Sequence, residues 1–476
     1  MERDELWIHS ARHLFPEARH ARSAMPVVCA QDFWRVLHAM MRTVRGHFPR
    51  SFLRLVYTLL LYLLMPLVLL RLWWRGRRNP GYHQRTPERF GLYSRTFPGG
   101  CIWIHAVSVG ESQATQPLMR WISDNLPDVP VVISTTTPTG ADRVVQMYRD
   151  TVTHVYFPYD LPFAIRRALR AFRPRLMVVM ETEIWPNLMH LCDEAGIPVL
   201  LANARLSAPS AKGYRRIRGL IAPAIRGFAA IAAQNLEDAE RFIGLGADRQ
   251  RVHVCGSVKF DVRIPASVRE HGELLRAAWG TGRHVWVAAS THPGEDELLL
   301  DVHKAILEKY PDALLVLTPR HPERFNDVAA LVDRQGFSYC RRSESPVCKR
   351  ESQVYLGDTM GELTVFFAAA DVAFVAGSLM PVGGHNVLEP ASLGLPVIVG
   401  PHMKNFLGIT QLMLDAGALV QVADSDELAR ALLGLFDNAE QRTAMGQAGL
   451  DVVERNQGAL DCVAELLAQS IKEPAP

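Results

Sequence analysis

Residues 101–112 read CIWIHAVSVGES: an apolar run, a short polar loop and the first residues of a more polar segment. The apolar run at 101–107 is typical of a buried β-strand. Gly110 permits a tight turn after it, and Glu111 is placed to begin a helix. The same succession of apolar run, polar loop and amphipathic stretch recurs along the rest of the chain. Strands that alternate with helices in this way predict βαβ units and parallel sheets.

Eleven apolar runs are predicted to form strands, in two series separated by a polar stretch at residues 260–282. The runs are 101–107, 131–133, 176–180, 199–202 and 229–233, followed by 285–289, 313–317, 354–356, 372–376, 396–399 and 419–422. Because this is too many strands for one simple doubly wound sheet, we predict an α/β fold of two Rossmann-like lobes that face each other across a cleft. The lobes are expected at residues 80–262 and 263–455. A helix within residues 456–476 is a candidate to cross back to the first lobe.

The composition excludes several classes of protein. Of the 476 residues, 48% are hydrophobic and 21% are charged, which excludes a largely disordered chain, a collagen and a coiled-coil rod. The net charge of +3 is far below the basic excess of a nucleic-acid-binding protein, so no nucleic-acid partner is expected. The seven cysteines are scattered singly, without a C-x-x-C pair. This pattern argues against a zinc site and a disulfide framework, and it favours a reducing compartment.

The stretch at residues 51–74 is predicted to be a membrane anchor. Its uncharged part, residues 55–70, would form a helix about 24 Å long, a little short of the ~30 Å hydrocarbon core of a bilayer. Arg54 and Arg71 could extend to the polar surface on either side. A buried core helix is the alternative, since Pro66 interrupts the run.

Arginines flank this predicted anchor on both sides, so charge only mildly favours a cytoplasmic position for the lobes. Those that follow it could hold lipid head groups or an anionic lipid substrate, and they are Arg71, Arg75, Arg77, Arg78, Arg85, Arg89 and Arg95. Residues 1–48 show no clear periodicity. They are interpreted as a disordered N-terminal extension, or as residues ahead of a true start at Met40 or Met41.

Acidic and basic residues follow the predicted strands of the first lobe. Glu111 would lie at a helix N-terminus, where a carboxylate is stabilised, although it could serve only as a capping acid. Glu181 and Glu183 follow the buried run 176–180, where burial and a second acid raise a pKa; a solvated loop is the alternative. Lys259 could neutralise a phosphate, or it could form a surface pair with Asp261.

Four polar loops follow strands of the second lobe, at residues 290–295, 318–323, 357–363 and 377–390. Their glycines would let backbone amides approach a phosphate, and Glu389 is placed to bind ribose hydroxyls. Plain helix capping explains each loop alone, but four together favour a nucleotide. The sequence contains no P-loop motif, which excludes a P-loop nucleotide-binding protein. It also lacks a G-x-G-x-x-G fingerprint, which weakens an NAD-binding interpretation. No paired acids suited to a divalent metal follow these strands, so metal dependence is not expected.

The ordered motifs resemble one family from about residue 52 to the end. HAVSVGESQA, TTTPTGAD, METEIWPNL, NARLS, GSVKFD, STHPGEDE, PRHPERF, GDTMGEL and GGHNVLEP are similar to those of the membrane-anchored 3-deoxy-D-manno-octulosonic acid (Kdo) transferases of lipopolysaccharide synthesis. The resemblance implies a glycosyltransferase-B fold. It also implies inverting, metal-independent transfer of Kdo from CMP-Kdo to a lipid A precursor, without a cofactor, at the cytoplasmic face of the inner membrane.

By resemblance, Glu111 is the general base, and Glu181 and Lys259 stabilise the transition state, although Glu181 and Glu183 could exchange roles. The first lobe would bind the acceptor and the second the CMP-sugar. The implied CMP contacts are Pro319, Arg320, Met360, Gly361, Glu362, Asn386, Val387, Leu388 and Glu389. Two alternatives are a transferase of the same fold that uses a UDP-sugar and a lipid acceptor, and an inactive scaffold tethered to the membrane. The intact Glu111, Lys259 and Arg320 argue against the scaffold.

Overall fold

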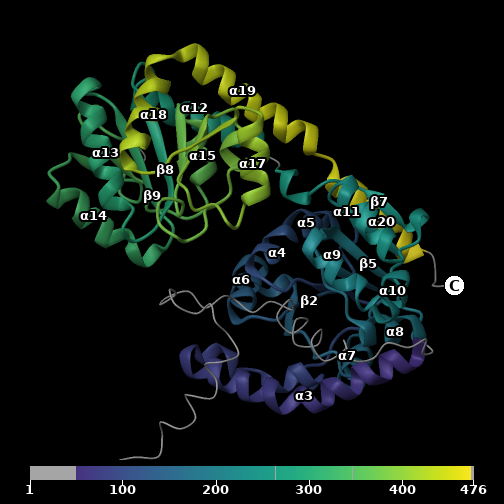
Figure 1. The fold of residues 1–476 in the computed structure, drawn as a ribbon. Coiled ribbons are helices and arrows are strands. Elements are labelled where there is room, and N and C mark those ends of the chain that lie inside the picture. Colours follow the sequence, from purple (N-terminus) through teal and green to yellow (C-terminus); the bar gives the residue numbers. More distant parts are fainter. Residues whose placement is uncertain (1–49, 263, 346, 473–476) are drawn as a thin grey trace, which may run out of the picture.

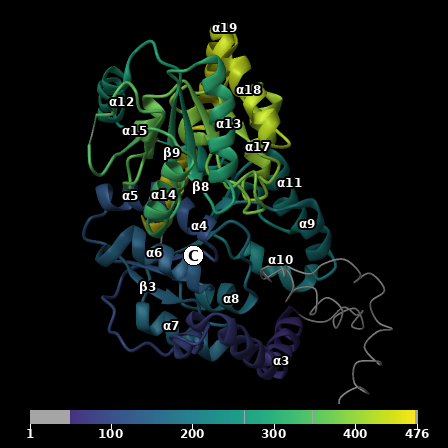
Figure 2. The ribbon, with the colours of Figure 1, turned by 90° about the vertical axis from the view of Figure 1, so that its left-hand side faces the viewer.

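The computed structural model describes residues 50–472, apart from residues 263 and 346. The predicted extension at residues 1–48 lies outside the described residues. The described chain forms two α/β lobes, each built on a parallel sheet of seven strands (Figure 1). Helices cover both faces of each sheet, and the turned view in Figure 2 shows the second lobe above the first. The two-lobed fold expected from the sequence is therefore confirmed.

The first sheet has the strand order β3-β2-β1-β4-β5-β6-β7. Its strands are β1 (Ile102–His105), β2 (Val131–Thr135), β3 (Thr153–Tyr156), β4 (Leu176–Met180), β5 (Val199–Ala204), β6 (Ala230–Ala233) and β7 (Val252–Val254). The helices of this lobe are α4 (Val109–Ala114), α5 (Gln116–Asn125), α6 (Pro138–Tyr148), α7 (Pro162–Phe172), α8 (Pro186–Glu194), α9 (Ala208–Arg215), α10 (Arg218–Arg226) and α11 (Leu236–Leu245). β1 lies between β2 and β4, so the loops that follow these strands share one edge of the sheet.

The second sheet has the strand order β10-β11-β9-β8-β12-β13-β14. Its strands are β8 (Val285–Thr291), β9 (Leu314–Pro319), β10 (Tyr339–Arg341), β11 (Val354–Leu356), β12 (Val372–Val375), β13 (Val397–Val399) and β14 (Leu419–Gln421). The helices are α12 (Ala266–Trp279), α13 (Asp296–Lys309), α14 (Phe325–Arg334), α15 (Leu363–Ala368), α16 (Leu388–Ala391), α17 (Leu407–Asp415), α18 (Ser425–Asp437) and α19 (Ala439–Asn456). The central strands β8 and β9 are almost wholly buried, as strands covered on both faces should be.

The last helix, α20 (Ala459–Lys472), packs on the first lobe although it follows the second in sequence. Its Leu460, Val463 and Leu467 are buried in one apolar cluster, and the helix packs against β5, β6 and α5. Asp261 holds the start of this helix, because its carboxylate accepts hydrogen bonds from the backbone N–H groups of Gly458 (2.8 Å) and Leu460 (2.7 Å).

A disulfide joins Cys255, which follows β7, to Cys462 on α20. The expectation that the cysteines form no disulfide is therefore wrong for this pair. The two residues are 207 positions apart, and only the return of α20 to the first lobe brings them together. Cys101, Cys192 and Cys348 are free and buried, where a cysteine behaves as a small apolar core residue.

The predicted anchor forms one helix, α3 (Arg50–Arg78), with Pro66 inside it. Residues 52–77 form a segment long and apolar enough to cross a membrane, and only 17% of its most apolar stretch is buried in the protein. One face of α3 packs on α8 and α10 of the first lobe, where Tyr57 is fully buried and donates a hydrogen bond to Asp160 (2.9 Å). The other face exposes large apolar side chains, namely Phe52, Leu55, Leu59, Tyr62, Leu63, Leu67, Leu69, Leu70, Trp73 and Trp74. The helix is thus docked on one side and open on the other, which excludes a wholly buried core helix.

Two of the arginines proposed to meet lipids contact residues of the first lobe. Arg85 forms a two-pronged ion pair with Glu88 (2.7 and 2.8 Å) and donates to the carbonyl of His154 (2.6 Å). Arg89 is only 4% exposed and donates to the carbonyl of Thr136 (3.1 Å). The interpretation as a head-group ligand is therefore wrong for the buried Arg89, whereas Arg85 is partly exposed and its role stays a prediction. A row of arginines in sequence did not reveal that the chain turns inward after α3.

Candidate active site

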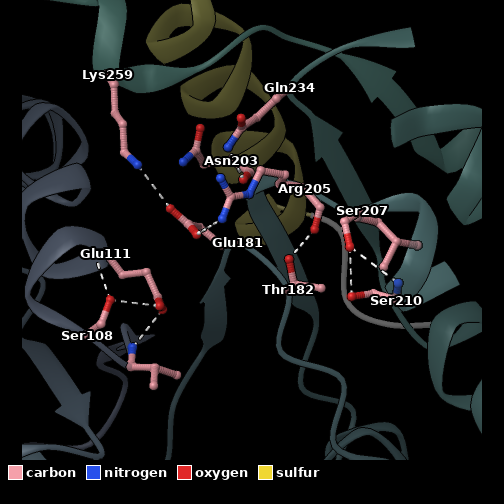
Figure 3. A network of polar contacts seen from close by, with 12 residues as sticks. Ser108, Glu111, Glu181, Thr182, Asn203, Arg205, Ser207, Ser210, Gln234 and Lys259 are labelled. Atoms are coloured by element: carbon pink, nitrogen blue, oxygen red, sulfur yellow. Dashed lines mark hydrogen bonds and ion pairs between the residues drawn. The ribbon is translucent and has the colours of Figure 1, made fainter. Parts of the chain in front are cut away.

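Glu111 lies in the first turn of α4, directly after β1. Ser108 caps this helix: its hydroxyl oxygen accepts from the Glu111 N–H (3.4 Å) and its O–H donates to Glu111 Oε1 (3.0 Å). The other carboxylate oxygen accepts from the Val107 N–H (2.7 Å). This arrangement is a variant of the capping box, because the Glu111 carboxylate accepts from the backbone of Val107 instead of that of Ser108 (Figure 3). Glu111 is therefore a capping acid, and its carboxylate is held in one orientation.

The surroundings of Glu111 make it a weak acid. Burial raises the pKa of its carboxyl group to about 8, and the charge of Glu181 adds to this effect. The hydrogen bonds from Val107 and Ser108 and the charge of Lys259 act in the opposite direction. A carboxylate with a pKa near neutrality is suited to accept a proton from a hydroxyl group and to release it later.

Glu181 follows β4 and carries two cationic neighbours. Its Oε1 lies 3.3 Å from Lys259 Nζ and its Oε2 lies 3.7 Å from an Arg205 nitrogen (Figure 3). The Glu181 side chain is 14% exposed, and its backbone has a φ of 58°, in the left-handed region that side chains other than glycine seldom adopt. Strained residues of this kind gather at functional sites. Lys259 is thus paired with Glu181 across the sheet edge.

Glu183 lies in the same loop but has different surroundings. Burial raises the pKa of its carboxyl group well above the usual range, and the charges of Glu111 and Glu181 raise it further. The loop is partly exposed, and within it burial favours the neutral form of Glu183, whereas Glu181 lies between two cations.

Asn203 is a site residue that the sequence did not single out. It belongs to β5, is fully buried and has a φ of 53°. Its Oδ1 accepts from the N–H of Val258, the residue before Lys259 (3.3 Å), and so holds the turn that carries the lysine. A polar residue inside the apolar strand VLLANA was the signal that could have identified it.

The loops of the second lobe bring the predicted nucleotide contacts to one sheet edge. Arg320 follows β9 and its backbone N–H donates to the Thr291 carbonyl (3.1 Å). Asn386 donates to Glu389 (3.1 Å), and burial raises the pKa of the Glu389 carboxyl group while Asn386 and Arg320 lower it. Arg143 of the first lobe faces this edge: burial lowers its pKa, and the charge of Arg320 contributes to that shift.

The remaining predicted contacts differ in what they can offer a ligand. Met360 is exposed, and Gly361 has a φ of 89°, which favours glycine. Glu362 is occupied by Arg342, whose hydrogen bonds lower the pKa of that carboxyl group. Val387 and Leu388 are buried in the core, so they can present only backbone groups.

Comparisons with known proteins agree with this arrangement. Residues 84–262 match the family model of 3-deoxy-D-manno-octulosonic-acid transferase (kdotransferase), and residues 283–452 match that of glycosyl transferases group 1. The chain is 41% identical over 417 residues to the 3-deoxy-D-manno-octulosonic acid transferase of Haemophilus influenzae, covering 87% of this chain and 98% of that protein. The chain belongs to the 3-deoxy-D-manno-octulosonic acid transferase family. The Bordetella pertussis member is 37% identical, over 83% of this chain and 94% of that one.

A solved domain is also similar to part of this family member. The C-terminal CMP-Kdo binding domain of WaaA from Acinetobacter baumannii is 32% identical, and the match covers 40% of this chain and all of that one, with a TM-score of 0.39. By its family, this Kdo transferase is a glycosyltransferase with two Rossmann-like lobes. Glu111, Glu181 and Lys259 meet at the edge of its first sheet, and the predicted nucleotide contacts follow strands of its second.

Proposed function

We propose that the protein transfers Kdo from CMP-Kdo to a hydroxyl group of a lipid A precursor. The observation that carries the proposal is the convergence of Glu111, Glu181 and Lys259 at the edge of the first sheet. In this mechanism, Glu111 takes the proton of the acceptor hydroxyl as its oxygen attacks C2 of Kdo. The bond from C2 to the phosphate oxygen breaks on the opposite side, and CMP leaves with that electron pair. A single displacement of this kind inverts the anomeric centre.

Glu181 and Lys259 would stabilise the charges that develop during transfer. The transition state is expected to carry positive charge on the sugar ring, which the Glu181 carboxylate favours. Negative charge develops on the departing phosphate, where the Lys259 ammonium group acts. Lys259 Nζ and Glu181 Oε1 are 3.3 Å apart, so the two opposite charges already lie side by side at the sheet edge.

The second lobe would hold CMP through the loops that follow its strands. Arg320 supplies a guanidinium group for the phosphate, and the backbone at residues 360–362 and 386–388 supplies amide groups. Glu389 would accept hydrogen bonds from the ribose hydroxyl groups. CMP leaves with a single phosphate, so protein cations are proposed to supply its counter-charge without a metal. Among the described residues, no three His, Cys, Asp or Glu side chains gather as a metal-binding group.

The open face of α3 supports attachment to a lipid surface. Its exposed leucines would enter the bilayer, and Trp73 and Trp74 suit the interface. Because α3 also packs on the first lobe, membrane attachment would keep the acceptor-binding lobe next to its lipid substrate. We place the lobes at the cytoplasmic face of the inner membrane.

The test is an assay of the detergent-solubilised protein with a tetra-acyl lipid A precursor and CMP-Kdo in the presence of EDTA, read by mass spectrometry. We expect the acceptor mass to rise by one or more Kdo units. The Glu111→Gln variant is expected to retain CMP binding and lose turnover. No mass shift while a control transferase is active would refute the proposal, and use of UDP-sugars instead of CMP-Kdo would reassign the donor.

A further inference from the structure

Two histidines of the second lobe face each other beside Arg320. His292 follows β8 and His385 lies in the loop after β12, and their Nε2 atoms are 2.8 Å apart. The two rings are nearly coplanar, with an angle of 9° between them. Both side chains are partly exposed, so a ligand can reach them. The function proposed above gives this pair no role.

The protein backbone is arranged to hold the pair in place. Glu295 is fully buried, and its Oε2 accepts from the backbone N–H groups of His292 (3.0 Å) and Gly377 (2.8 Å). Its Oε1 accepts from the Ser378 and Leu379 N–H groups (both 3.1 Å), so one carboxylate joins the two loops. A Cβ atom on Gly377 would lie 3.0 Å from the ring of His385 and 3.3 Å from that of His292. The rings therefore pack against a glycine whose positive φ of 68° a larger residue would not easily adopt.

Burial and the neighbouring positive charges favour the neutral form of both rings. Burial lowers the pKa of His385 to about 3, and His292, Arg320 and His321 contribute to this shift. Burial also lowers the pKa of His292, and His321, Arg324 and Arg320 act in the same direction. Of the nearby acids, Glu295 is engaged with four backbone N–H groups and Glu389 with Asn386. An anion placed here would offset the neighbouring positive charges and favour the protonated imidazole.

Hydrogen-bond chemistry limits how many protons the pair can hold. With the Nε2 atoms 2.8 Å apart, one ring must donate its N–H and the other must accept with a lone pair. Two Nε2–H groups cannot face each other at this distance. The intact pair can therefore take up one proton, at the Nδ1 atom of the donating ring, and it then carries one positive charge.

We propose that the His292–His385 pair binds an anionic oxygen of the sugar donor and takes up one proton from solvent as it does so. The oxygen belongs to the phosphate of CMP or to the carboxylate of Kdo. This inference rests on the proposed function and adds to it two donor-binding residues and a proton-linked step.

The test is calorimetric titration of CMP-Kdo, without acceptor, in two buffers of different ionisation enthalpy at about pH 8. The protein carries Glu111→Gln, since binding of an anion could also protonate Glu111. We expect uptake of about one proton per donor bound, and an affinity that weakens by up to about tenfold per pH unit above neutrality. The double variant His292→Gln/His385→Gln should lose the proton uptake and bind CMP-Kdo about ten- to hundredfold more weakly. His271→Gln, an exposed histidine on α12, is the matched control.

The outcomes separate the two proposals. Binding without proton uptake, with unchanged affinity in the double variant, would overturn the role of the pair and leave the proposed function intact. Absence of CMP-Kdo binding to the folded parent protein would overturn the proposed function itself. A titration of CMP alone identifies the source of the oxygen, since uptake with CMP assigns the phosphate and uptake only with CMP-Kdo assigns the carboxylate.

Discussion

The substitution Ser108→Ala should move the pH dependence of transfer without changing its maximum rate. Ser108 Oγ donates to Glu111 Oε1 over 3.0 Å, and this hydrogen bond lowers the pKa of the Glu111 carboxyl group. A hydrogen bond to a charged group contributes about 1.5–3 kcal/mol. Glu111 is partly exposed, so water replaces some of this energy and the lower end applies. Because one pKa unit corresponds to about 1.4 kcal/mol, we expect the Glu111 pKa to rise from about 8 to about 9.

The size of the effect then depends on pH. With a pKa of about 8, roughly one Glu111 in ten is ionised at pH 7, and with a pKa of about 9 roughly one in a hundred. The kcat/KM of Ser108→Ala should therefore be about tenfold below that of the unsubstituted enzyme at pH 7 and equal to it within about twofold at pH 10. Loss of the helix cap should also reduce the free energy of unfolding by about 1 kcal/mol.

The assay is kcat/KM below saturation of both substrates, measured across this pH range. Ser112→Ala is the matched control, since Ser112 belongs to the same turn but donates to the Ser108 carbonyl (2.9 Å). Ser112→Ala should not shift the pH range over which kcat/KM rises. If Ser108→Ala reduces kcat/KM by the same factor at every pH, the rise of kcat/KM with pH does not reflect ionisation of Glu111. That result would refute the assignment of Glu111 as the base.

Three further predictions concern stability, the membrane and the nucleotide. Because the folded pKa of Glu111 lies above its ordinary value of 4.5, its contribution to stability falls as pH rises from about 4.5 to about 8. Glu111→Gln should therefore raise the free energy of unfolding by about 2–4 kcal/mol at pH 9 and leave it unchanged near pH 4, as denaturant titrations would show. Leu63→Asp with Leu67→Asp should reduce binding to lipid vesicles by at least about a hundredfold, whereas Leu92→Asp, exposed outside α3, should not. CMP should raise the Tm of the unsubstituted enzyme more than UDP does, and Arg320→Ala should weaken CMP binding about ten- to hundredfold.

The sequence predicts the centre of each sheet better than its margins. All eleven apolar runs form strands, because a strand buried on both faces needs a continuous apolar segment. The three strands that the sequence analysis missed are β3, β7 and β10, and each lies at the edge of its sheet. β7 and β10 are partly exposed, and β3 carries polar residues such as Thr153 and His154, so no apolar run marks these three strands.

The positions of the candidate catalytic residues follow from topology, but their contacts do not. Parallel strands end at one edge, so Glu111 and Glu181 could be placed near each other from the order of strands and loops alone. Glu181 and Asn203 both have a positive φ, which neither residue type predicts. The contacts of Glu181 with Lys259 and Arg205 depend on that backbone conformation, so the sequence could not predict them. The disulfide between Cys255 and Cys462 was missed because it depends on the path of α20.

The two lobes differ in the groups that they leave available at their sheet edges, and this difference matches the two substrates. In the first lobe, burial and the charge of Glu181 raise the pKa of the Glu111 and Glu183 carboxyl groups, which suits an acceptor that must lose a proton. In the second lobe, the acids are already engaged: Glu295 with backbone N–H groups, and Glu362 with Arg342. Arg320 and the two facing imidazoles remain for the ligand. In the mechanism proposed above, a donor that leaves as an anion would be stabilised by that second set of groups together with Lys259 of the first lobe.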